Sequence, residues 1–496
     1  MTHDYHQENL VPEAFRPAFH YSPARNWMND PNGLVWHDGE YHLFYQYNPL
    51  GNDWGNMSWG HAVSPDLQTW EELPVAIPFS DNEQIFSGSI VVDHANSAGF
   101  GTLGAPAMIA LYTSVYEEGG RQAQSLAYST DRGRTWTRYD GNPVLDTGAS
   151  DFRDPKVFWH AEGGYWVMVV VLAAERIVQF YRSDNLTDWE HLSDFATGNL
   201  ADGLWECPDL FELPVDGGGG QERSRWVLVL SVNPGAPAGG SGTRYLVGDF
   251  DGKCFTPGAA ADDTWLDYGA DCYAAVSFSD TPDGERVLMG WMSNWQYAAQ
   301  VPTTPHRGSM TLPRTCRLGR IDGRLRLLQR PVGPASSLRA PEPGVEMRDV
   351  LVPEGVMLLP EPAHGEALEV SAEFTLGSAE RFGLNLRQNG DQRTVVGYDT
   401  RSGSLYIDRT ATGSGAFHDA FPAVHHGPLA AEGGRVRLRI YVDATSVEVF
   451  GGRGECVLTD QIFPDDDSRA CSLFAEGGEV TVTYLDVTPL KPAFAG

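Results

Sequence analysis

Hydrophobic residues in this chain occur in short runs rather than in long helical patterns. Most runs are rich in β-branched and aromatic residues, and Gly, Pro, Asp and Asn separate them. Such runs are typical of β-strands, so the chain is predicted to be all-β. The runs recur as pairs at intervals of roughly 50 to 70 residues, a period typical of propeller blades. The five pairs are 34–36 with 41–47, 90–92 with 108–113, 157–159 with 165–171, 210–213 with 226–232, and 274–278 with 286–291.

A tryptophan follows several of these pairs at a similar position. Trp70, Trp136 and Trp189 each come a few residues after a Ser-Pro-Asp, Ser-Thr-Asp or Ser-Asp turn. This signature indicates an outer hairpin whose turn ends in a packed indole ring. Several strands per repeat are typical of propeller blades, so we predict a five-bladed β-propeller catalytic domain over residues 1–335. A β-solenoid is the alternative, although its repeats would be shorter.

The last third of the chain has a different pattern. Apolar residues alternate strictly with other residues in 368–374, 436–442 and 480–484. This period is typical of half-buried antiparallel strands, and we predict a β-sandwich over 351–496. The segment 331–353 is rich in Pro, Gly and Ser, and 336–350 within it is the expected linker. A length of 496 residues also exceeds one ordinary core, which agrees with two domains.

Charge and cysteine content narrow the possible functions. The formal net charge of −31 repels nucleic acid and anionic membranes and favours a neutral substrate. The six cysteines include no CxxC pair, no His/Cys cluster has zinc spacing, and no HExxH motif occurs. We therefore expect no metal and no other cofactor.

The sequence contains no pattern typical of a membrane span or a signal peptide. The longest apolar run, 165–174, is about half the length of a transmembrane helix. The first residues include neither a basic region nor an apolar stretch, so the sequence as it stands predicts a cytoplasmic protein. Secretion would require a signal peptide that has been removed. The oligomeric state is left open.

A propeller brings the first strand of every blade to one axis, so residues at the starts of these strands meet in one funnel. Residues at the predicted starts are Asp30, Ser87, Asp154, Glu206 and Asp271. One Asp beside Pro or Asn is usually a turn former. Three carboxylates at equivalent positions, each in an apolar or aromatic context, instead indicate a shared pocket. Such a pocket suits glycoside cleavage, in which two carboxylates act as nucleophile and acid/base.

The three carboxylates lie in distinctive motifs. These are Trp27-Met28-Asn29-Asp30-Pro31-Asn32-Gly33, Phe152-Arg153-Asp154-Pro155 and Trp205-Glu206-Cys207-Pro208-Asp209. They resemble the hallmark motifs of the invertase–levanase–inulinase family, glycoside hydrolase family 32. The resemblance covers most of residues 20–330 in order and includes 44–49, 54–61, 86–89 and 290–297. It implies a five-bladed propeller with a C-terminal β-sandwich, which agrees with the repeats.

The resemblance implies a retaining β-fructofuranosidase. Such an enzyme releases terminal non-reducing β-D-fructofuranosyl units from sucrose or fructans through a covalent fructosyl-enzyme intermediate. It makes Asp30 the nucleophile, Glu206 the general acid/base and Asp154 the transition-state stabiliser. A guanidinium at Arg153 can bind hydroxyls and also keep Asp154 ionised. The implied substrate-binding residues are Asn29, Gln46, Trp54, Phe86, Ser87, Arg153, Tyr273 and Trp291.

Two residues near these motifs have more than one interpretation. Cys207 is next to Glu206 and either tunes that acid or is a packed thiol. Family members often have Trp before the Arg-Gly that follows the 290–297 motif, whereas this chain has His306. We expect that position near the pocket rim, where the change either alters the leaving-group preference or is a harmless surface change.

Other functions are compatible with parts of the pattern. A fructosyltransferase would pass the same fructosyl unit to an acceptor sugar, and no motif separates it from a hydrolase. A carbohydrate-binding protein without catalysis would not need three intact carboxylates. A propeller glycosidase for arabinose polymers would not need the 27–33 motif. The preference among sucrose, inulin and levan is left open.

Overall fold

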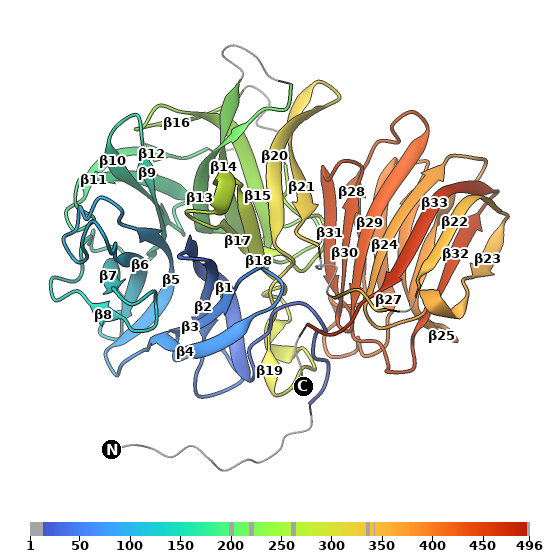
Figure 1. Cartoon of the computed structure of the whole chain (residues 1–496), viewed down its shortest axis with the longest axis horizontal. Helices are drawn as coiled ribbons and strands as arrows, with labels where there is room; N and C mark the ends of the chain where they lie inside the picture. The colour runs from blue at the N-terminus through green and yellow to red at the C-terminus, as the bar shows by residue number, and fades with distance from the viewer. Residues whose placement is uncertain are drawn as a thin grey trace.

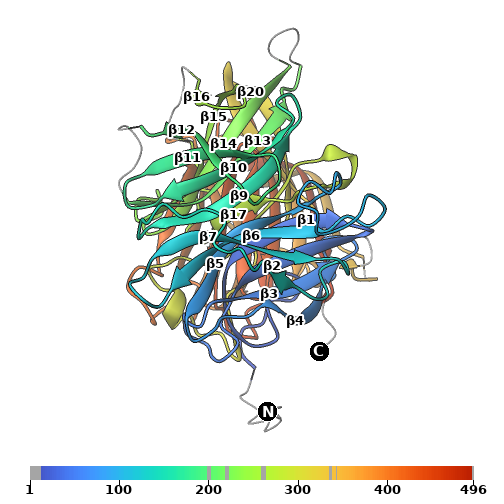
Figure 2. The ribbon, with the colours of Figure 1, turned by 90° about the vertical axis from the view of Figure 1, so that its left-hand side faces the viewer.

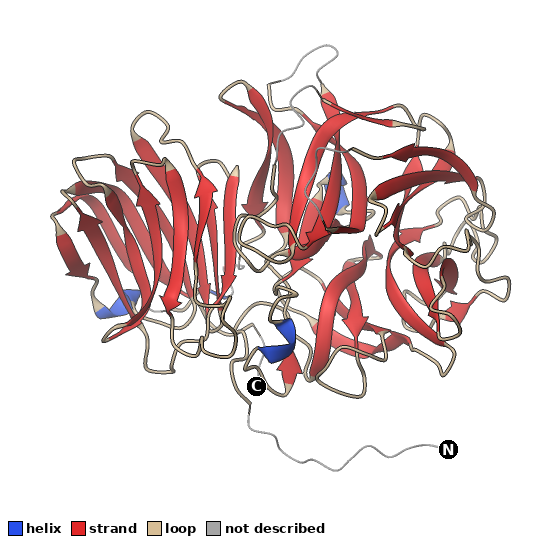
Figure 3. Cartoon of the chain, turned by 180° about the vertical axis from the view of Figure 1, so that it is seen from behind, coloured by secondary structure: helices blue, strands red, loops and turns tan. Residues whose placement is uncertain are grey.

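The computed structural model describes residues 13–197, 203–217, 223–258, 264–333, 338–341 and 343–493. Nearly all of its regular structure is strand, as Figure 3 shows, so the predicted all-β class is confirmed. Short 3₁₀ turns occur at Pro282–Gly284, Ala298–Gln300 and Glu361–Ala363. Sheets from the first two-thirds of the chain form one body, and the last third forms a second body beside it (Figure 1). Within the described ranges, no helix is long and apolar enough to span a membrane.

The described strands of the N-terminal body form five sheets. The first contains β1 (Asn26–His37), β2 (Glu40–Tyr47), β3 (Ser58–Ser64) and β4 (Glu71–Ile77), with β19 (His306–Arg307) beside β1. The second contains β5 (Glu83–Val92), β6 (Met108–Tyr116), β7 (Gln122–Ser129) and β8 (Thr137–Arg138). The third contains β9 (Phe152–His160), β10 (Tyr165–Leu172), β11 (Ile177–Ser183) and β12 (Glu190–Phe195). The fourth contains β13 (Leu204–Pro214), β14 (Ser224–Asn233), β15 (Gly242–Phe250) and β16 (Phe255–Pro257). The fifth contains β17 (Tyr273–Ser277), β18 (Val287–Trp291), β20 (Arg314–Ile321) and β21 (Arg324–Pro331).

The first strands of these sheets contact one another in a ring. Strand β1 contacts β5, β5 contacts β9, β9 contacts β13, β13 contacts β17, and β17 contacts β1. The sheets therefore surround one axis, and Figure 2 views the molecule from the side of this body. Each predicted pair of hydrophobic runs falls on the first two strands of one sheet. The number of five blades stays a prediction, and this ring supports it.

The outer turns have the structure that the tryptophan signature predicts. Trp136 and Trp189 come directly before the last strands of their sheets. Each indole donates a hydrogen bond back into its own turn, Trp136 to the carbonyl of Gly133 and Trp189 to that of Leu186, both at 3.0 Å. The ring thus closes the turn with one polar contact while its apolar surface packs between strands.

The C-terminal body is a sandwich of two antiparallel sheets. One contains β22 (Val345–Val352), β33 (Val480–Pro489), β24 (Leu368–Thr375), β29 (Arg435–Asp443), β30 (Ser446–Gly451) and β31 (Cys456–Gln461). The other contains β23 (Gly355–Leu358), β32 (Ala470–Glu476), β25 (Arg381–Asn389), β26 (Gln392–Asp399), β27 (Ser404–Ala411) and β28 (Val424–Pro428). Alternate residues of both sheets, such as Val370, Ile440 and Leu473, form one buried core, as the alternation predicts.

The expected linker and the sandwich overlap. Strand β22 begins at Val345 and pairs with β33, so the end of the 336–350 segment is already part of the sandwich sheet. Its Pro and Gly residues obscured a strand whose side chains are half exposed at a sheet edge. Residues 334–337 and 342 lie outside the described residues.

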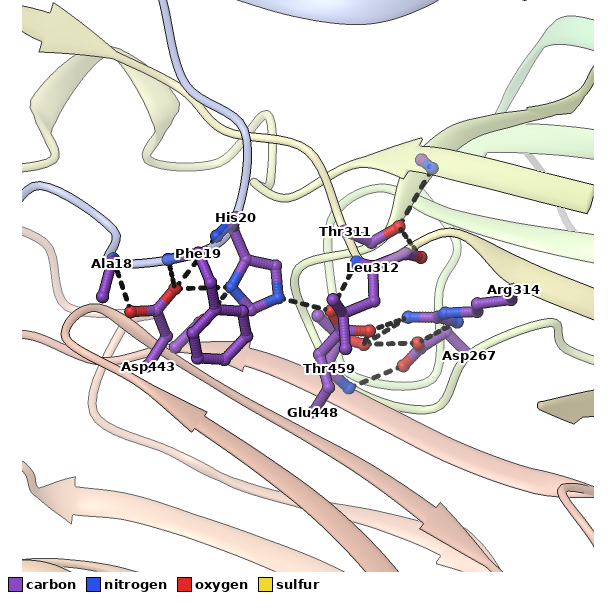
Figure 4. A network of polar contacts seen from close by, with 12 residues as sticks. Ala18, Phe19, His20, Asp267, Thr311, Leu312, Arg314, Asp443, Glu448 and Thr459 are labelled. Carbon is purple, nitrogen blue, oxygen red and sulfur yellow. Dashed lines mark hydrogen bonds and ion pairs between the residues drawn. The ribbon is translucent and has the colours of Figure 1, made fainter. Parts of the chain in front are cut away.

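Buried ionic contacts join the propeller to the sandwich (Figure 4). His20 lies between two sandwich carboxylates, with Nδ1 2.7 Å from Asp443 Oδ2 and Nε2 2.8 Å from Glu448 Oε1. Arg314, from β20, donates to Glu448 Oε2 at 2.6 Å and to Asp267 Oδ2 at 2.9 Å. The interface between the two domains therefore contains paired charges in addition to apolar contacts.

Candidate active site

The first strand of each propeller sheet has a shift in register near the funnel. The shifts lie between Met28 and Pro31, Ile85 and Gly88, Arg153 and Lys156, Glu206 and Asp209, and Tyr273 and Val276. A β-bulge bends its strand and re-aims a side chain. Pro155 and Pro208 lie inside two of these bulges, where a missing N–H costs no ladder hydrogen bond. The sequence around each carboxylate therefore favours a bulge.

Three of the bulges place non-glycine residues in the left-handed region. Asp154 has φ 65°, Cys207 has φ 47° and Ala274 has φ 52°. Such conformations are rare for residues with a Cβ and cluster at functional sites. The Asp154 N–H donates to Thr113 Oγ1 at 2.9 Å, which holds the turned backbone in place.

The carboxylate of Asp30 is fixed by three donors. Its Oδ2 accepts hydrogen bonds from Ser87 Oγ at 2.7 Å and from the Cys207 thiol at 3.4 Å. Its Oδ1 accepts one from Asn29 Nδ2 at 3.1 Å. The Asn29 amide is oriented in turn by the Trp27 indole N–H, which donates to Asn29 Oδ1 at 2.7 Å. The 27–33 motif thus both supplies the carboxylate and orients it.

Cys207 links the two aspartates. Its backbone N–H donates to Asp154 Oδ2 at 2.9 Å, and its thiol lies 3.7 Å from the same oxygen. The thiol also contacts Asp30, as described above. Cys207 is thus more than a packed thiol, and its hydrogen bonds go to Asp30 and Asp154 rather than to its neighbour Glu206. Burial raises the pKa of the Cys207 thiol well above its usual range.

Glu206 is bound on both of its oxygens. Arg153 donates to Oε1 from Nε at 3.3 Å and from Nη2 at 3.2 Å, and the Tyr273 hydroxyl donates to Oε2. The other side of the guanidinium donates from Nη1 to Asp151 Oδ1 at 3.1 Å and to Gln122 Oε1 at 3.3 Å. Sequence reasoning missed Gln122 and Asp151. Gln122 lies in no motif, and only the closeness of Asp151 to the 152–155 motif could have pointed to it.

The funnel holds more negative than positive charge. Burial raises the pKa of Asp30, and the nearby charge of Glu206 adds to this. Burial raises the pKa of Asp154 to about 7; the charge of Arg153 opposes this rise, and the charges of Glu206 and Asp30 add to it. Perturbed carboxylates in a cleft are typical of functional sites. Among the residues that the structure describes, no group of three or more His, Cys, Asp or Glu side chains could hold a metal ion.

Aromatic side chains surround these carboxylates. Tyr273 and Trp291 are buried in one cluster with Cys207, and Phe86 and Trp295 pack against it. This cluster forms the wall of the funnel.

Two further predicted residues lie on the other side of Phe86. Trp54 is 48% exposed and meets Phe86 edge to face, with 5.9 Å between the ring centroids. Gln46 is buried and donates to the carbonyl of Ile85 at 3.1 Å, next to Phe86. The contacts therefore connect all the predicted substrate-binding residues to one site.

Asp271 does not belong to this site, although its position at a strand start suggested it. Its Oδ2 accepts from Arg409 Nη1 at 2.6 Å and from the Gln461 N–H at 2.8 Å, and its Oδ1 accepts from the Tyr297 hydroxyl at 2.7 Å. Arg409 and Gln461 belong to the sandwich. Asp271 precedes β17 and points to the interface between the domains, whereas the other carboxylates lie in the bulges.

His306 is also placed differently from the expectation. It is buried in β19, paired with Asn26 at the edge of the first sheet, so it is not a surface position. Burial lowers the pKa of His306 to about 3, which keeps the ring neutral. Its neighbour Arg307 instead reaches the loop before Trp54 and donates to the carbonyl of Asn52 at 3.1 Å.

A propeller funnel that contains several fixed, buried carboxylates among aromatic walls has the chemical groups of a glycoside hydrolase. Family profiles agree with this class: "Glycosyl hydrolases family 32 N-terminal domain" matches residues 20–331, and "Glycosyl hydrolases family 32 C terminal" matches 341–489. The chain belongs to glycoside hydrolase family 32 and is a glycoside hydrolase.

Individual relatives support the assignment over the whole chain. A levanase of Bacillus subtilis is 47% identical over 97% of this chain and 71% of its own length. An extracellular exo-inulinase of Aspergillus ficuum is 42% identical over 96% of this chain and 94% of its own length. The crystal structure of an exo-inulinase from Aspergillus awamori superposes with a TM-score of 0.92 at 41% identity, covering 97% of this chain and 99% of that one. These relationships confirm the propeller followed by a sandwich.

Proposed function

We propose that this chain is a retaining β-fructofuranosidase that releases terminal fructosyl units from sucrose or fructans. Its levanase and exo-inulinase relatives support hydrolysis of β-fructosides. The observation that carries the retaining mechanism is that contacts connect the three carboxylates to one another. Asp30 and Asp154 are both bound by Cys207, and the residue directly before Cys207 is Glu206, which Arg153 holds. Three carboxylates fixed around one pocket provide the groups that a double-displacement reaction requires.

In the first step, we assign Asp30 as the nucleophile. Its donors, Ser87 and Asn29, hold the carboxylate in one orientation, so that an oxygen can attack the anomeric carbon without reorganisation. Glu206 acts as the acid, and it transfers a proton to the departing glycosidic oxygen. In the second step the same group removes a proton from water, and the water displaces Asp30.

Asp154 has a different part in this scheme. It stabilises the positive charge that develops on the sugar ring, and it binds fructose hydroxyls. The neighbouring Arg153 opposes the rise of the Asp154 pKa and so favours the ionised form that this part requires. The same guanidinium orients Glu206, so Arg153 links the stabiliser to the acid.

The aromatic wall supports an exo mode of action. Tyr273 and Trp291 are buried, and Trp54, which lies beside Phe86, is 48% exposed. A wall of this kind suits one terminal fructosyl unit. Chromatography of the products from sucrose, inulin and levan over time tests this. Free fructose alone supports exo-hydrolysis, early short oligomers indicate endo-cleavage, and new oligosaccharides from sucrose indicate transfer to an acceptor sugar.

Azide rescue tests the mechanism. In Glu206→Ala, both the acid and the base are lost, but azide can attack a covalent intermediate without a base. With an aryl β-fructofuranoside, whose leaving group needs little acid help, azide is expected to raise turnover and give β-fructosyl azide, detected by mass spectrometry and NMR. Asp30→Ala should give no such product, because it forms no intermediate on the opposite face.

Glu212→Ala is the matched control, since Glu212 is an exposed glutamate of the same strand. It should keep wild-type turnover and show no response to azide. An azide product of α configuration from Glu206→Ala, or a normal rate without azide, would refute the assignment.

A further inference from the structure

The outer face of the second sandwich sheet contains a groove. Alternate residues of this sheet, such as Leu384, Val396 and Ile407, belong to the core, so the residues between them face outward. The outward residues surround a groove of about 560 Å³, a size within the range of small-ligand sites. It lies in the sandwich, away from the carboxylates of the funnel.

Two glycines in neighbouring strands lie along this outer face. The register places Gly383 of β25 directly opposite Gly397 of β26. Glycine inside a strand weakens the sheet and often marks a place where a ligand approaches the backbone closely. Here a Cβ at Gly383 would lie 2.1 Å from the Val396 carbonyl oxygen, so the backbone requires glycine.

Aromatic rings flank this glycine pair in the same cross-strand row. Phe474 pairs with Gly383, and Tyr406 pairs with Gly397. The Tyr406 ring covers Gly397, where a Cβ would be 2.3 Å from the ring. His426 continues the row, and its ring centroid is 5.6 Å from that of Tyr406. Flat rings at the bottom of a groove suit the C–H faces of sugar rings.

Polar groups beside this row are already oriented. Asn385 is buried, and its Nδ2 donates to Ser472 Oγ at 3.0 Å, while that hydroxyl donates to Gln388 at 3.0 Å. Arg381, Arg393, Asp408 and Glu476 also line the groove, and Arg381 lies opposite Glu476 on the neighbouring strand.

The charges of these lining residues balance, which favours a neutral ligand. A chain with a net charge of −31 disfavours a polyanion in any case. Planar amide, guanidinium and carboxylate groups beside aromatic rings are suited to sugar hydroxyls.

At Val424 the groove reaches the start of β28, next to the segment that joins β27 to β28. The segment that joins β27 to β28 packs Phe417 and Phe421 against Tyr297. Tyr297 comes two residues after Trp295, which belongs to the funnel wall. A polymer held in the groove could therefore present one end to the funnel.

We propose that this groove binds a fructan chain and holds it while the funnel shortens its free end. That the bound polymer is a fructan rests on the proposed function, whereas the groove as a binding site does not depend on it. Binding at a second site raises the effective concentration of chain ends at the first. The groove should therefore matter for polymers and not for sucrose.

Affinity electrophoresis tests the groove apart from catalysis. Native gels containing levan, inulin or dextran are run with Asp30→Asn protein, and saturating sucrose in the gel occupies the funnel. Levan or inulin should retard this protein, whereas dextran should not. Arg381→Ala, which removes a lining donor, and Val395→Trp, which fills the groove, should each weaken the apparent Kd by about ten-fold.

Arg435→Ala is the matched control on the other sheet. Arg381 pairs with Asp399 at 3.0 Å and is 56% exposed, and Arg435 pairs with Glu373 at 2.8 Å and is 49% exposed. Arg435→Ala should keep the wild-type retardation. In the active enzyme, the two groove variants should hydrolyse sucrose within about two-fold of the wild type and lose about ten-fold in kcat/KM on polymer.

Equal retardation of all variants, or equal retardation by dextran, would overturn the proposal. So would sedimentation of the wild type as a dimer that Val395→Trp converts to monomers, because a second copy would then fill the groove. Failure of the wild type to hydrolyse sucrose and fructans would contradict the proposed function instead, and the gels would still report on the groove.

Discussion

The funnel and the domain interface both bury several carboxylates, yet they balance the charge differently. In the funnel, Arg153 is the guanidinium hydrogen-bonded to Glu206, and its charge also acts on Asp154. At the interface, cations alternate with carboxylates. His20 lies between Asp443 and Glu448, and Arg314 lies between Glu448 and Asp267. Arg409 likewise binds Asp271 and lies 4.0 Å from Asp460, which also has a hydrogen bond to His425.

The pKa values of Asp443 and Glu448 follow this difference. Burial raises the pKa of Asp30 and of Asp154, since the funnel supplies too little positive charge to oppose it. Burial acts in the same direction on Asp443 and Glu448, but His20 lowers the pKa of Asp443, and Arg314 and His20 lower that of Glu448, so both pKa values end below their usual range. Burial alone therefore does not make a carboxylate reactive. The cations around Asp443 and Glu448 outweigh burial, whereas burial still raises the pKa of Asp271 despite the charge of Arg409, so a raised pKa alone does not mark the active site either.

The largest expected effect comes from Asp154→Asn. Loss of the charge should lower kcat by about a thousand-fold or more, with a much smaller change in KM, because the group acts on the transition state. The free energy of unfolding should stay equal or rise, since a buried carboxylate among like charges is removed. Steady-state kinetics on sucrose and urea unfolding measure the two quantities. A large rise in KM with unchanged kcat would make Asp154 a plain binding residue.

Arg409→Met should have the opposite pattern. It leaves Asp271 buried without its cation, which should lower the free energy of unfolding by about 3–5 kcal/mol. The kcat of the folded protein should change less than two-fold, because Asp271 lies outside the funnel. Arg435→Met, which removes an exposed ion pair, should cost less than about 1 kcal/mol. Loss of kcat in folded Arg409→Met protein would indicate that Asp271 belongs to the active site after all.

The contrast between Asp154 and Asp271 also shows which features the sequence could predict and which it could not. Repeated pairs of strand-like runs predicted the sheets, because each run and its turn are local features. The carboxylate motifs predicted the funnel, since their prolines and aromatic neighbours favour bulges at one end of the strands. Asp271 has a similar place along the chain, but its partner Arg409 is 138 residues away, and no local pattern connects them.

The groove on the sandwich and the environment of His306 could not be predicted for a related reason. The row of Phe474, Gly383, Gly397 and Tyr406 exists only through the register of four strands that are not all consecutive. His306 pairs with Asn26 from the opposite end of the propeller domain. Both features depend on pairing between distant segments, which hydrophobic patterning does not specify.

The dependence of stability on pH tests the role of His20 at the domain interface. Burial lowers its pKa, but the hydrogen bonds and charges of Asp443 and Glu448 raise it overall, from 6.5 to about 9. A raised pKa means that the contribution to stability is complete below pH 6.5 and is lost as the pH rises through about 9. The contribution of the two carboxylates, whose pKa values are lowered, is lost instead as the pH falls through those values.

Stability should therefore be greatest in mildly acidic solution. Between pH 6 and pH 10 the wild type should lose about 3 kcal/mol of unfolding free energy through this group. Urea unfolding at a series of pH values measures the loss, and His20→Gln should be less stable at pH 6 but show a flatter dependence. Equal slopes for the two proteins would mean that the buried histidine is neutral in the folded state.

The smallest expected effect comes from Asp151→Asn, which removes a charge at the outer side of Arg153. Asp151 accepts from Arg153 Nη1 at 3.1 Å on the side away from Glu206, and its side chain is 43% exposed. Asp151→Asn keeps an oxygen that can accept the same hydrogen bond, and Gln122 still holds the guanidinium. Only the negative charge is lost, so Arg153 should act more strongly on Asp154 and lower its pKa.

The acid limb of kcat/KM reports the carboxylates of the free enzyme, which titrate as a coupled group. In Asp151→Asn this limb should move to lower pH by about 0.2–0.5 unit, because the removed charge is partly screened by solvent. Asp249→Asn, which removes an exposed carboxylate of β15, should leave the limb in place. A shift of the limb to higher pH would show instead that Asp151 acts by positioning Arg153, since a displaced guanidinium would leave Asp154 more easily protonated.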